Sequence, residues 1–507
     1  MMELDESSGN KVALPESWIE LQVKEAVINI STTDRKIPQK FYLESGAFPV
    51  IDQGRNYIGG YTNNESMLVD CDLPVIIFGD HTKAIKHVNQ RFAAGADGVK
   101  VLKPLQFLEP SFSFYTLLNA ATRLKSKGYA RHFQEFSKLK IKIPPLPEQV
   151  RIVAKLEELF SELDQGVEYL RTAQQQLKVY RQALLKHAFE GKLTADWRAQ
   201  NPDKLESAEA LLARIQKERE ARYQQQIAEW REAQQAWEAA SKTGSKPTKP
   251  KTPKVQPPLT TEELTELPDL PEGWAWGRLG YMTCGVEYGT AAKSSETGKV
   301  AVLRMGNIQN SRFDWQDLVY TDDADEIAKY SLRHDDVLFN RTNSPELVGK
   351  AAIYKSEQPA LFAGYLIRIN QIGTIAKAQF VNLFLASHVA KQHGSKVKTD
   401  GVNQSNINGE KLANYPFPYC HASEQDAVVA VLEDKLSNLE QLESTITTSL
   451  QQAEALRQSI LKKAFSGQLV PQSPDDEPAS VLLERIRSER TAQQPARKRG
   501  RKVATSA

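Results

Sequence analysis

The chain has 507 residues, which is too long for one ordinary domain, so two to four domains are expected. Its 65 basic and 63 acidic residues nearly balance, and the net charge therefore neither requires nor excludes a nucleic-acid partner. No segment approaches the roughly 18 apolar residues that cross a membrane, and the acidic stretch from Met1 to Asn10 is not a secretory signal. Cys71, Cys284 and Cys420 form no CxxC pair, which favours a reducing cytoplasm.

One sequence pattern occurs twice, and it flanks two dissimilar regions, residues 19–143 and 275–416. The recurring pairs are LPESW at 14–18 with LPEGW at 270–274, Glu-Gln at 148–149 with 424–425, RQALLKHAFEGKL from 181 with RQSILKKAFSGQL from 457, and LLARI at 211–215 with LLERI at 482–486. The second and third pairs share an offset of 276, which predicts one duplicated scaffold. A purely structural duplication gives no reason for the two dissimilar regions to differ so much in sequence.

Each repeated arm is predicted to be a long helix with a coiled-coil seam, because apolar residues recur in alternating steps of four and three. The expected seam is Ile152, Leu156, Leu159, Leu163, Gly166, Leu170, Ala173, Leu177, Tyr180 and Leu184 in one arm, and Val428, Leu432, Lys435, Leu439, Leu442, Ile446, Ser449, Ala453, Leu456 and Ile460 in the other. Prolines at 144, 145, 147, 416 and 418 mark the starts, and Gly191 and Gly467 mark the ends. Each helix would be roughly 60 Å long, and the two most economically pack on each other.

The remaining segments complete a division into six parts. A charged helix is expected over 204–240, residues 242–258 read as a Lys/Pro/Thr-rich tether, and residues 497–502 form a basic tail. Tether and tail could also attract DNA phosphates. The expected boundaries are 1–147, first globular domain; 148–240, first arm; 241–262, linker; 263–422, second globular domain; 423–470, second arm; and 471–507, C-terminal extension.

Both dissimilar regions alternate short strand-like runs with turn signals, which predicts mixed α/β domains. Polar side chains cluster where strands end, and amide and guanidinium groups suit adenine and guanine edges. We therefore expect two DNA-contacting sets. The first set is Gln53, Arg55, Asn56, Tyr57, His81, Lys83 and Lys86. The second set is Tyr288, Thr290, Lys293, Arg304, Asn307, Asn340, Arg341, Asn343 and Ser344.

Catalytic motifs are missing from the sequence. We find no GxGxxG, no GxxxxGK[ST] and no Asn/Asp-Pro-Pro-Tyr/Phe motif, and the spacing of Cys71, His81 and His87 fits no zinc site. The chain is therefore expected to be neither a methyltransferase nor a nuclease and to hold no metal. A coiled-coil scaffold that binds only protein stays open as an alternative.

The paired Leu-Pro-Glu-x-Trp openings, the Ile-Pro-Pro-Leu-Pro-Glu-Gln segment at 143–149 and the twin Arg-Gln-x-[LI]-Leu-Lys-x-Ala-Phe-x-Gly-x-Leu helix ends resemble specificity subunits of Type I restriction–modification systems. The resemblance covers essentially the whole chain. One departure is the segment before the second Glu-Gln, residues 415–425, which loses Pro-Leu-Pro. We expect only that the segment leading into the second helix has a different conformation.

This resemblance implies two target recognition domains that each read half of a split DNA site. It implies an antiparallel pair of helices, an internal pseudo-twofold repeat, and a helix length that sets the gap between half-sites. Two modification subunits would supply methylation that depends on S-adenosylmethionine, and two restriction subunits would add translocation and cleavage with ATP and Mg; the chain itself would bind no cofactor. The partner-binding residues expected on the repeated arms are Arg181, Phe189, Arg457 and Phe465.

Overall fold

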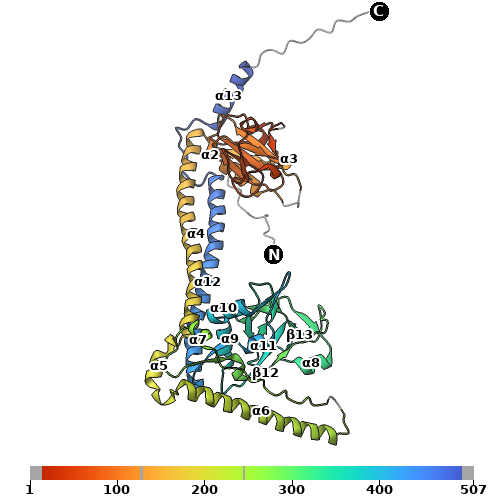
Figure 1. Ribbon diagram of the computed structural model, residues 1–507. Helices are drawn as coiled ribbons and strands as arrows, with labels where there is room; N and C mark the ends of the chain where they lie inside the picture. The colour runs from red at the N-terminus through yellow and green to blue at the C-terminus, as the bar shows by residue number, and fades with distance from the viewer. Residues whose placement is uncertain (1–13, 33, 97, 126–129, 244–245, 494–507) are drawn as a thin grey trace, which may run out of the picture. The chain divides into compact units, whose positions relative to one another are not determined.

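The structure is a computed structural model that describes residues 14–32, 34–96, 98–125, 130–243 and 246–493. The predictions for Met1 to Asn10 and for the basic tail at 497–502 therefore lie outside the described residues. The chain divides into two compact units, Met1–Arg171 with Thr447–Ala507 and Thr172–Ile446. Each unit contains one globular lobe and parts of both long helices (Figure 1). We call residues 19–143 lobe 1 and residues 275–419 lobe 2.

The two long helices are present where the repeats predicted them. Helix α4 spans Leu146–Phe189 and helix α12 spans Ala422–Ala464. Gly191 and Gly467 follow them with φ angles of 71° and 76°, a left-handed conformation that ends a helix and that glycine adopts without strain.

In each unit, the beginning of one long helix packs beside the end of the other, so the pairing is antiparallel. In the first unit, Leu156 of α4 shares a hydrophobic core with Ile460 of α12. In the second unit, Leu184 of α4 shares a core with Leu432 of α12. Buried apolar side chains therefore stabilise the predicted coiled coil in both units.

The seam differs from the predicted heptad at three positions. Tyr180, Leu442 and Leu456 are 51%, 52% and 51% exposed, so they do not lie between the helices. Tyr180 and Leu456 are one repeat apart, because 456 − 180 = 276. A strict seven-residue period drifts around a straight α-helix, which carries such positions off the contact line.

In its described residues, lobe 1 contains two four-stranded β-sheets, a two-stranded sheet of β1 and β10, and three helices. One four-stranded sheet has the strand order β2-β9-β6-β7 and is antiparallel, and the other has the order β3-β8-β4-β5 with β4 and β8 parallel. The strands are β1 (Ile19–Gln22), β2 (Val27–Ile30), β3 (Lys36–Ile37), β4 (Phe48–Ile51), β5 (Gly60–Thr62), β6 (Val75–Gly79), β7 (Ile85–Val88), β8 (Ala93–Gly95), β9 (Val99–Pro104) and β10 (Lys140–Ile143); the helices are α1 (Val23–Ala26), α2 (Pro110–Thr122) and α3 (Phe133–Phe136).

Lobe 2 has corresponding sheets with the strand orders β12-β21-β17-β19 and β16-β13-β20 in its described residues. Its strands are β11 (Ala275–Arg278), β12 (Thr283–Tyr288), β13 (Val300–Leu303), β14 (Ile308–Gln309), β15 (Arg312–Phe313), β16 (Val319–Thr321), β17 (Val337–Asn340), β18 (Thr342–Asn343), β19 (Ala351–Ile353), β20 (Ala360–Phe362), β21 (Leu366–Gln371), β22 (Thr399–Asp400), β23 (Ser405–Asn406) and β24 (Pro416–Tyr419). Its helices are α8 (Ala324–Tyr330), α9 (Ala378–Leu385), α10 (His388–Val397) and α11 (Gly409–Ala413).

The two lobes share one topology despite their dissimilar sequences. In the antiparallel sheet of lobe 1, β2 pairs with β9, and β9 pairs with β6. In the antiparallel sheet of lobe 2, β12 pairs with β21, and β21 pairs with β17. The parallel pairs β4·β8 and β13·β20 also correspond. The loops after β4 and β13, and those after β6 and β17, are therefore equivalent positions.

A glutamine side chain helps to fasten each lobe to its long helix. The side chain of Gln149 accepts a hydrogen bond from the backbone N–H of Glu109 at 2.7 Å and donates to the carbonyls of Phe107 and Pro144, each at 3.0 Å. These three bonds fasten the start of α2 and the end of β10 to α4. We call this arrangement the glutamine clasp.

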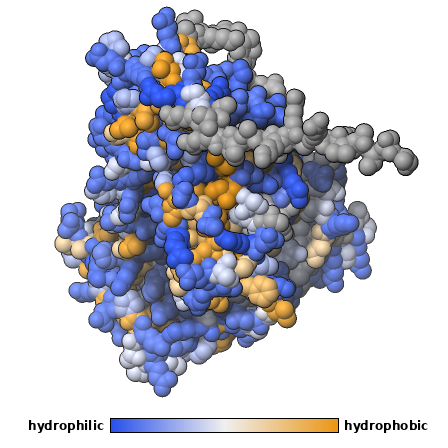
Figure 2. Space-filling model, turned by 90° about the horizontal axis from the view of Figure 1, so that it is seen from above, coloured by the Kyte–Doolittle hydropathy of each residue, from blue (hydrophilic) through white to orange (hydrophobic). Residues whose placement is uncertain are grey.

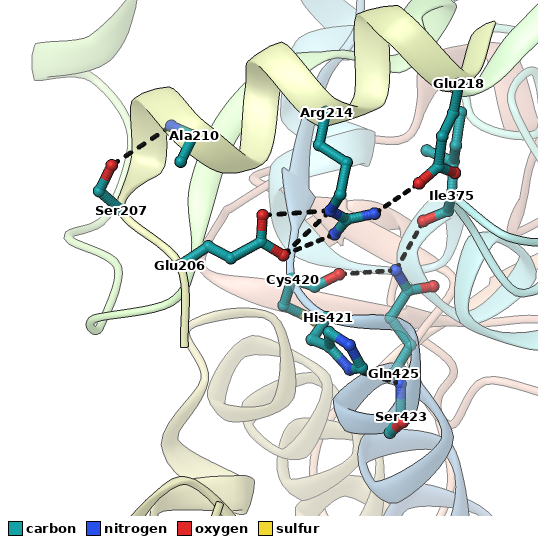
Figure 3. A network of polar contacts seen from close by, with 10 residues as sticks. All are labelled: Glu206, Ser207, Ala210, Arg214, Glu218, Ile375, Cys420, His421, Ser423 and Gln425. Atoms are coloured by element: carbon teal, nitrogen blue, oxygen red, sulfur yellow. Dashed lines mark hydrogen bonds and ion pairs between the residues drawn. The ribbon is translucent and has the colours of Figure 1, made fainter. Parts of the chain in front are cut away.

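Lobe 2 has the same clasp on α12. Gln425 accepts a hydrogen bond from the N–H of Lys377 at 2.8 Å. It donates to the carbonyls of Ile375 and Cys420 at 2.9 and 3.1 Å (Figure 3). Nearby, Arg214 of helix α6 (Ala208–Ala239) bridges Glu206 and Glu218 (Figure 3). The glutamine of the repeated Glu-Gln pair is thus an attachment point in both units.

The arm end of each repeat packs on the lobe of the other repeat. Phe189 of α4 contacts the rings of Phe380 and Phe384 in lobe 2 at 5.1 and 5.3 Å between centroids. Phe465, directly after α12, contacts Phe112 in lobe 1 at 5.7 Å. A Cβ atom on Gly191 would lie 2.5 Å from Pro271, and one on Gly467 would lie 2.7 Å from Pro15, so both glycines admit a proline of the Leu-Pro-Glu motif.

The described part of the Lys/Pro-rich linker lies along α6 and bonds to it, while most of its residues stay exposed. Arg219, Tyr223 and Trp230 of α6 bond to the backbone of Lys254, the side chain of Thr252 and the backbone of Pro247 at 2.9, 3.1 and 3.2 Å. Proline-rich backbone keeps its carbonyls available as acceptors, and Arg219 and Trp230 of α6 donate to two of them. The last helix, α13 (Ala479–Gln493), places Leu483 in the core of the first unit.

Most of the surface seen in Figure 2 is hydrophilic, with smaller apolar patches. Within the described residues, every helix is too short or too polar to cross a membrane.

Candidate nucleic-acid interface

Two predicted segments of lobe 1 lie side by side where strands β4 and β6 end. The backbone N–H of His81 donates to Oε1 of Gln53 at 3.2 Å, and the hydroxyl of Thr82 donates to the carbonyl of Gln53 at 2.5 Å. Gly98, in the turn before β9, lies close to the side chains of Gln53 and His81. Gln53 therefore connects the loop after β4 to the turn after β6.

The exposed tip of the loop after β4 carries the predicted polar groups. Arg55 and Asn56 are exposed and make no hydrogen bond or ion pair with any described residue. Tyr57 donates its hydroxyl proton to the carbonyl of His87 at 2.8 Å, which fixes the ring beside them. An unpaired guanidinium and amide on a fixed loop have the chemistry to contact base edges.

Lys86 does not belong to this exposed set, which corrects the prediction. Its side chain is only 5% exposed, and its ammonium group donates to the carbonyl of Asp52 at 2.8 Å. Burial lowers the pKa of Lys86, while the nearby Asp52 carboxylate opposes that shift. Lys83 likewise donates to the carbonyl of Leu124 at 3.3 Å, so both lysines support the loops.

Arg341 is the central candidate of lobe 2. It directly follows β17, and its guanidinium lies 4.9 Å from the centroid of the Tyr288 ring. Its Nε atom is buried without a hydrogen-bond partner among the described residues. The hydroxyl of Tyr288 accepts from the N–H of Gly409 at 2.9 Å, so the ring under Arg341 is fixed. Arg341 is thus oriented before any ligand binds.

Asn343, Ser344 and Lys293 lie at or near the surface of lobe 2. Asn343 and Ser344 are half-buried and follow Arg341 on the same loop, with Oδ1 of Asn343 accepting from the N–H of Ser344 at 2.8 Å. Lys293 is exposed on the segment after β12. The three residues keep their place as candidates.

Four predicted residues of lobe 2 are buried or already contact other residues of the lobe. Thr290 is buried and its hydroxyl donates to Glu326. Asn307 is buried and donates to the carbonyls of Asp314 and Gln316, and Arg304 contacts Asp317 at 3.2 Å. Asn340 is fully buried at the end of β17. Polar residues after strands have two uses, loop support and ligand contact, and sequence alone does not separate them.

The prediction missed a hairpin beside Arg341. Strands β22 and β23 pair through Thr399 with Asn406, and β23 also pairs with β18. At its tip, Val402 is fully exposed, and Asn403 and Gln404 are exposed as well. The Asp-Gly pair at 400–401 is a hairpin signal that marks this turn in the sequence.

The four predicted partner-binding residues have structural contacts. Phe189 and Phe465 are 2% and 6% exposed inside hydrophobic cores, which corrects the prediction of direct docking through these rings. Arg181 lies 4.0 Å from Glu440, and Arg457 contacts Asp164. Because 440 − 164 = 276, the two arginines make the same bridge between α4 and α12.

The family described as Type I restriction modification DNA specificity domain matches residues 15–169 and 284–452. The chain belongs to this family. Both matched segments of the specificity family begin near or within a lobe and end within α4 or α12. Among the described residues, no group of three or more His, Cys, Asp or Glu side chains is placed to hold a metal ion.

Several proteins of the specificity family are similar to this chain. The putative type I restriction enzyme MjaX specificity subunit of Methanocaldococcus jannaschii is 28% identical over 40% of this chain and 48% of its own length. The chain thus spans about half the length of that relative. The type I restriction enzyme StySPI specificity subunit of Salmonella potsdam is 23% identical over 95% of this chain and 97% of its own length.

A solved structure supports the fold. A chain from a study of complex assembly and conformational transition of the type I R-M system aligns with a TM-score of 0.57 at 17% identity, covering 90% of this chain and all of that one. The fold of this chain therefore resembles that of a solved structure.

Proposed function

We propose that this chain is the DNA-recognition subunit of a Type I restriction–modification complex, in which each lobe reads one half of a bipartite site. One observation carries the proposal: two lobes of equal topology and different sequence place donor-bearing loops at equivalent strand ends. Arg341 on Tyr288 in lobe 2 and Arg55 in lobe 1 are the groups we assign to base contacts. A scaffold that binds only protein leaves these arginines without a role.

The chain acts without catalysis of its own in this proposal. Methylation, translocation and cleavage come from partner subunits that use S-adenosylmethionine, ATP and Mg, and the complex works in the cytoplasm. Purified alone, the chain is expected to neither methylate nor cleave DNA. Methyl transfer by the isolated chain, after exclusion of a contaminating methyltransferase, would contradict this part.

Two modification subunits dock on equivalent surfaces of the repeated arms. Tyr180 and Leu456 support this assignment, because they occupy the same repeat position and are both half exposed beside a bridging arginine. An aromatic and an aliphatic side chain exposed on a helix are suited to a partner interface. We assign docking to these two residues in place of Phe189 and Phe465.

Native mass spectrometry tests the docking surfaces. The wild-type chain is expected to hold two modification subunits, Tyr180→Asp and Leu456→Asp are each expected to hold one, and the double variant is expected to hold none. Val255→Asp, a change at a 92% exposed position outside the helices, is the control. A wild-type complex with one modification subunit is the contrary result.

Methylation-site sequencing in a host that carries the chain with its partner subunits tests the recognition proposal and the role of helix length together. Four residues inserted after both Ala173 and Ser449, which are one repeat apart, lengthen both helices by roughly 6 Å. At about 3.4 Å for each base pair, the gap is expected to grow by one to two base pairs while the half-sites stay the same. A wild-type methylome without an enriched bipartite motif contradicts the function, and an unchanged gap contradicts only the ruler.

A further inference from the structure

A cavity of about 480 Å³ lies in the second unit, at the foot of the loop that carries Arg341. Its walls come from the end of α4, from residues 308–311 after β13, from residues 345–351 after β17, and from α10. The loops after β13 and β17 are equivalent to the two loops that Gln53 joins in lobe 1. The cavity therefore occupies the position at which lobe 1 presents its polar loops.

Three positively charged side chains line the cavity, and few negative charges lie close enough to neutralise them. The ammonium groups of Lys350 and Lys391 have no hydrogen-bond or ion-pair partner among the described residues. The guanidinium of Arg181 has its nearest ion-pair partner, Glu440, at 4.0 Å. Among the described lining residues, Glu346 is the only acid. An anion in the cavity would neutralise a positive cluster that the fold leaves open.

The cations also act on one another. Burial lowers the pKa of Lys391, and the positive charges of Arg181 and Lys350 lower it further. Like charges held together in a partly desolvated cavity cost free energy, which a bound anion recovers.

A hydrogen-bond donor completes the lining. Tyr415 is only 1% exposed, and its hydroxyl group has no hydrogen-bond partner among the described residues. A buried hydroxyl without a partner is costly, and proteins rarely keep one without a compensating ligand or water. An anion with several acceptor oxygens could accept from this hydroxyl and from the lysines together.

We propose that this cavity binds a phosphate group of the DNA backbone next to the half-site that lobe 2 reads. The inference rests on the proposed function, because the loop of residues 341–351 links the guanidinium assigned to a base with the wall of the cavity. Lysines are compact charges that position phosphates without reading sequence, whereas a stacked arginine can read a guanine. Free inorganic phosphate has the same chemistry and is the other possible source of the anion.

The test compares two double variants of the full-length chain that remove the same charge from the second unit. Lys350→Gln with Lys391→Gln empties the cavity of its free cations. The control, Lys355→Gln with Lys396→Gln, removes two lysines that pair outside it with Glu433 and Glu266. Fluorescence anisotropy measures binding to a duplex with the mapped target and to a scrambled duplex, over a series of salt concentrations.

The cavity variant is expected to lose affinity about tenfold for both duplexes. Its plot of log K against log salt should be shallower by about 1, the signature of one lost phosphate contact. Tyr415→Phe should lower the affinity as well without lowering the melting temperature, because the hydroxyl makes no bond in the free chain. Equal behaviour of the cavity variant and the charge-matched control would overturn the proposal.

Two further measurements distinguish DNA phosphate from other ligands of the cavity. If inorganic phosphate binds the cavity by calorimetry but DNA affinity is unchanged in the cavity variant, the site serves a free anion and the proposal is wrong. If the variant loses a modification subunit and retains DNA, the cavity accepts an acidic protein surface, and the proposal is wrong again. A wild-type chain that binds both duplexes equally, with the variant still weaker for both, would reject sequence recognition while supporting the phosphate site.

Discussion

Lobe 1 and lobe 2 are attached in the same way and present different chemistry. Gln149 and Gln425 each make three hydrogen bonds to the same three backbone positions of their lobes. By contrast, lobe 1 presents Arg55 on a loop without a partner, whereas lobe 2 holds Arg341 against Tyr288. The two lobes are therefore attached to the long helices in the same way, but each holds its candidate arginine differently.

The largest losses of stability are expected from substitutions of the equivalent buried phenylalanines in the two cores. Phe189→Ala should reduce the free energy of unfolding of the second unit by about 3–5 kcal/mol, and Phe465→Ala should do the same in the first unit, because each removes a buried ring. Urea denaturation gives the size, and hydrogen exchange shows which unit has lost protection. A change below about 1 kcal/mol in either variant would show that the two arm ends are not equivalent.

The clasps should respond equally to the same substitution. Gln149→Leu or Gln425→Leu keeps the volume and leaves a buried N–H and carbonyls unpaired, at a cost of about 2–3 kcal/mol in each unit. The comparison is made by thermal unfolding of the two single variants. A much smaller loss at Gln425 would mean that lobe 2 depends on its other contacts, such as those of Glu424 with Thr194 and Arg198.

The two arginines should differ in how they contribute to recognition. Arg341→Ala should relax one half-site only, with a loss of discrimination of about 1–3 kcal/mol. Arg55→Ala should relax the other half-site, and by less, because its free side chain loses more entropy on binding. Competition binding against single-base variants of the mapped target measures both effects.

Arg341→Lys is the matched control for charge. A lysine keeps the phosphate attraction but loses the planar fork and the stacking on Tyr288. Uniform weakening for all sequences by both alanine variants would identify the arginines as phosphate anchors.

The smallest effects concern the bridges between the helices. Arg457→Ala removes a stack on the ring of Phe160, 4.6 Å away, as well as the contact with Asp164, and should cost about 1 kcal/mol. Arg181→Ala removes only a contact of 4.0 Å with Glu440 and should cost about 0.5 kcal/mol or less. Measured melting temperatures in the reverse order would indicate that the cavity cluster around Arg181 destabilises the free chain.

Sequence reasoning succeeded where a pattern repeats and failed where a side chain has two possible uses. The heptad spacing of apolar residues predicted both long helices, and Gly191 and Gly467 predicted their ends, because periodicity and backbone conformation are local properties. Lys86 and Asn307 were predicted to face DNA and instead support loops, because their partners are backbone carbonyls that lie close only after folding. Phe189 was predicted as a docking residue for the same reason, since its aromatic partners lie almost 200 positions away in the chain.

The glutamine clasp makes the lobes interchangeable in principle. Every group that Gln149 or Gln425 binds belongs to the main chain, so the clasp accepts any side chains at those positions. A foreign lobe would need an N–H and a carbonyl two residues apart at the start of a helix, an aromatic residue three positions after that N–H, and apolar side chains that pack against the long helices. Side chains outside these contacts and outside the cores shared with the long helices are free to vary, so a new specificity can be grafted onto an unchanged frame.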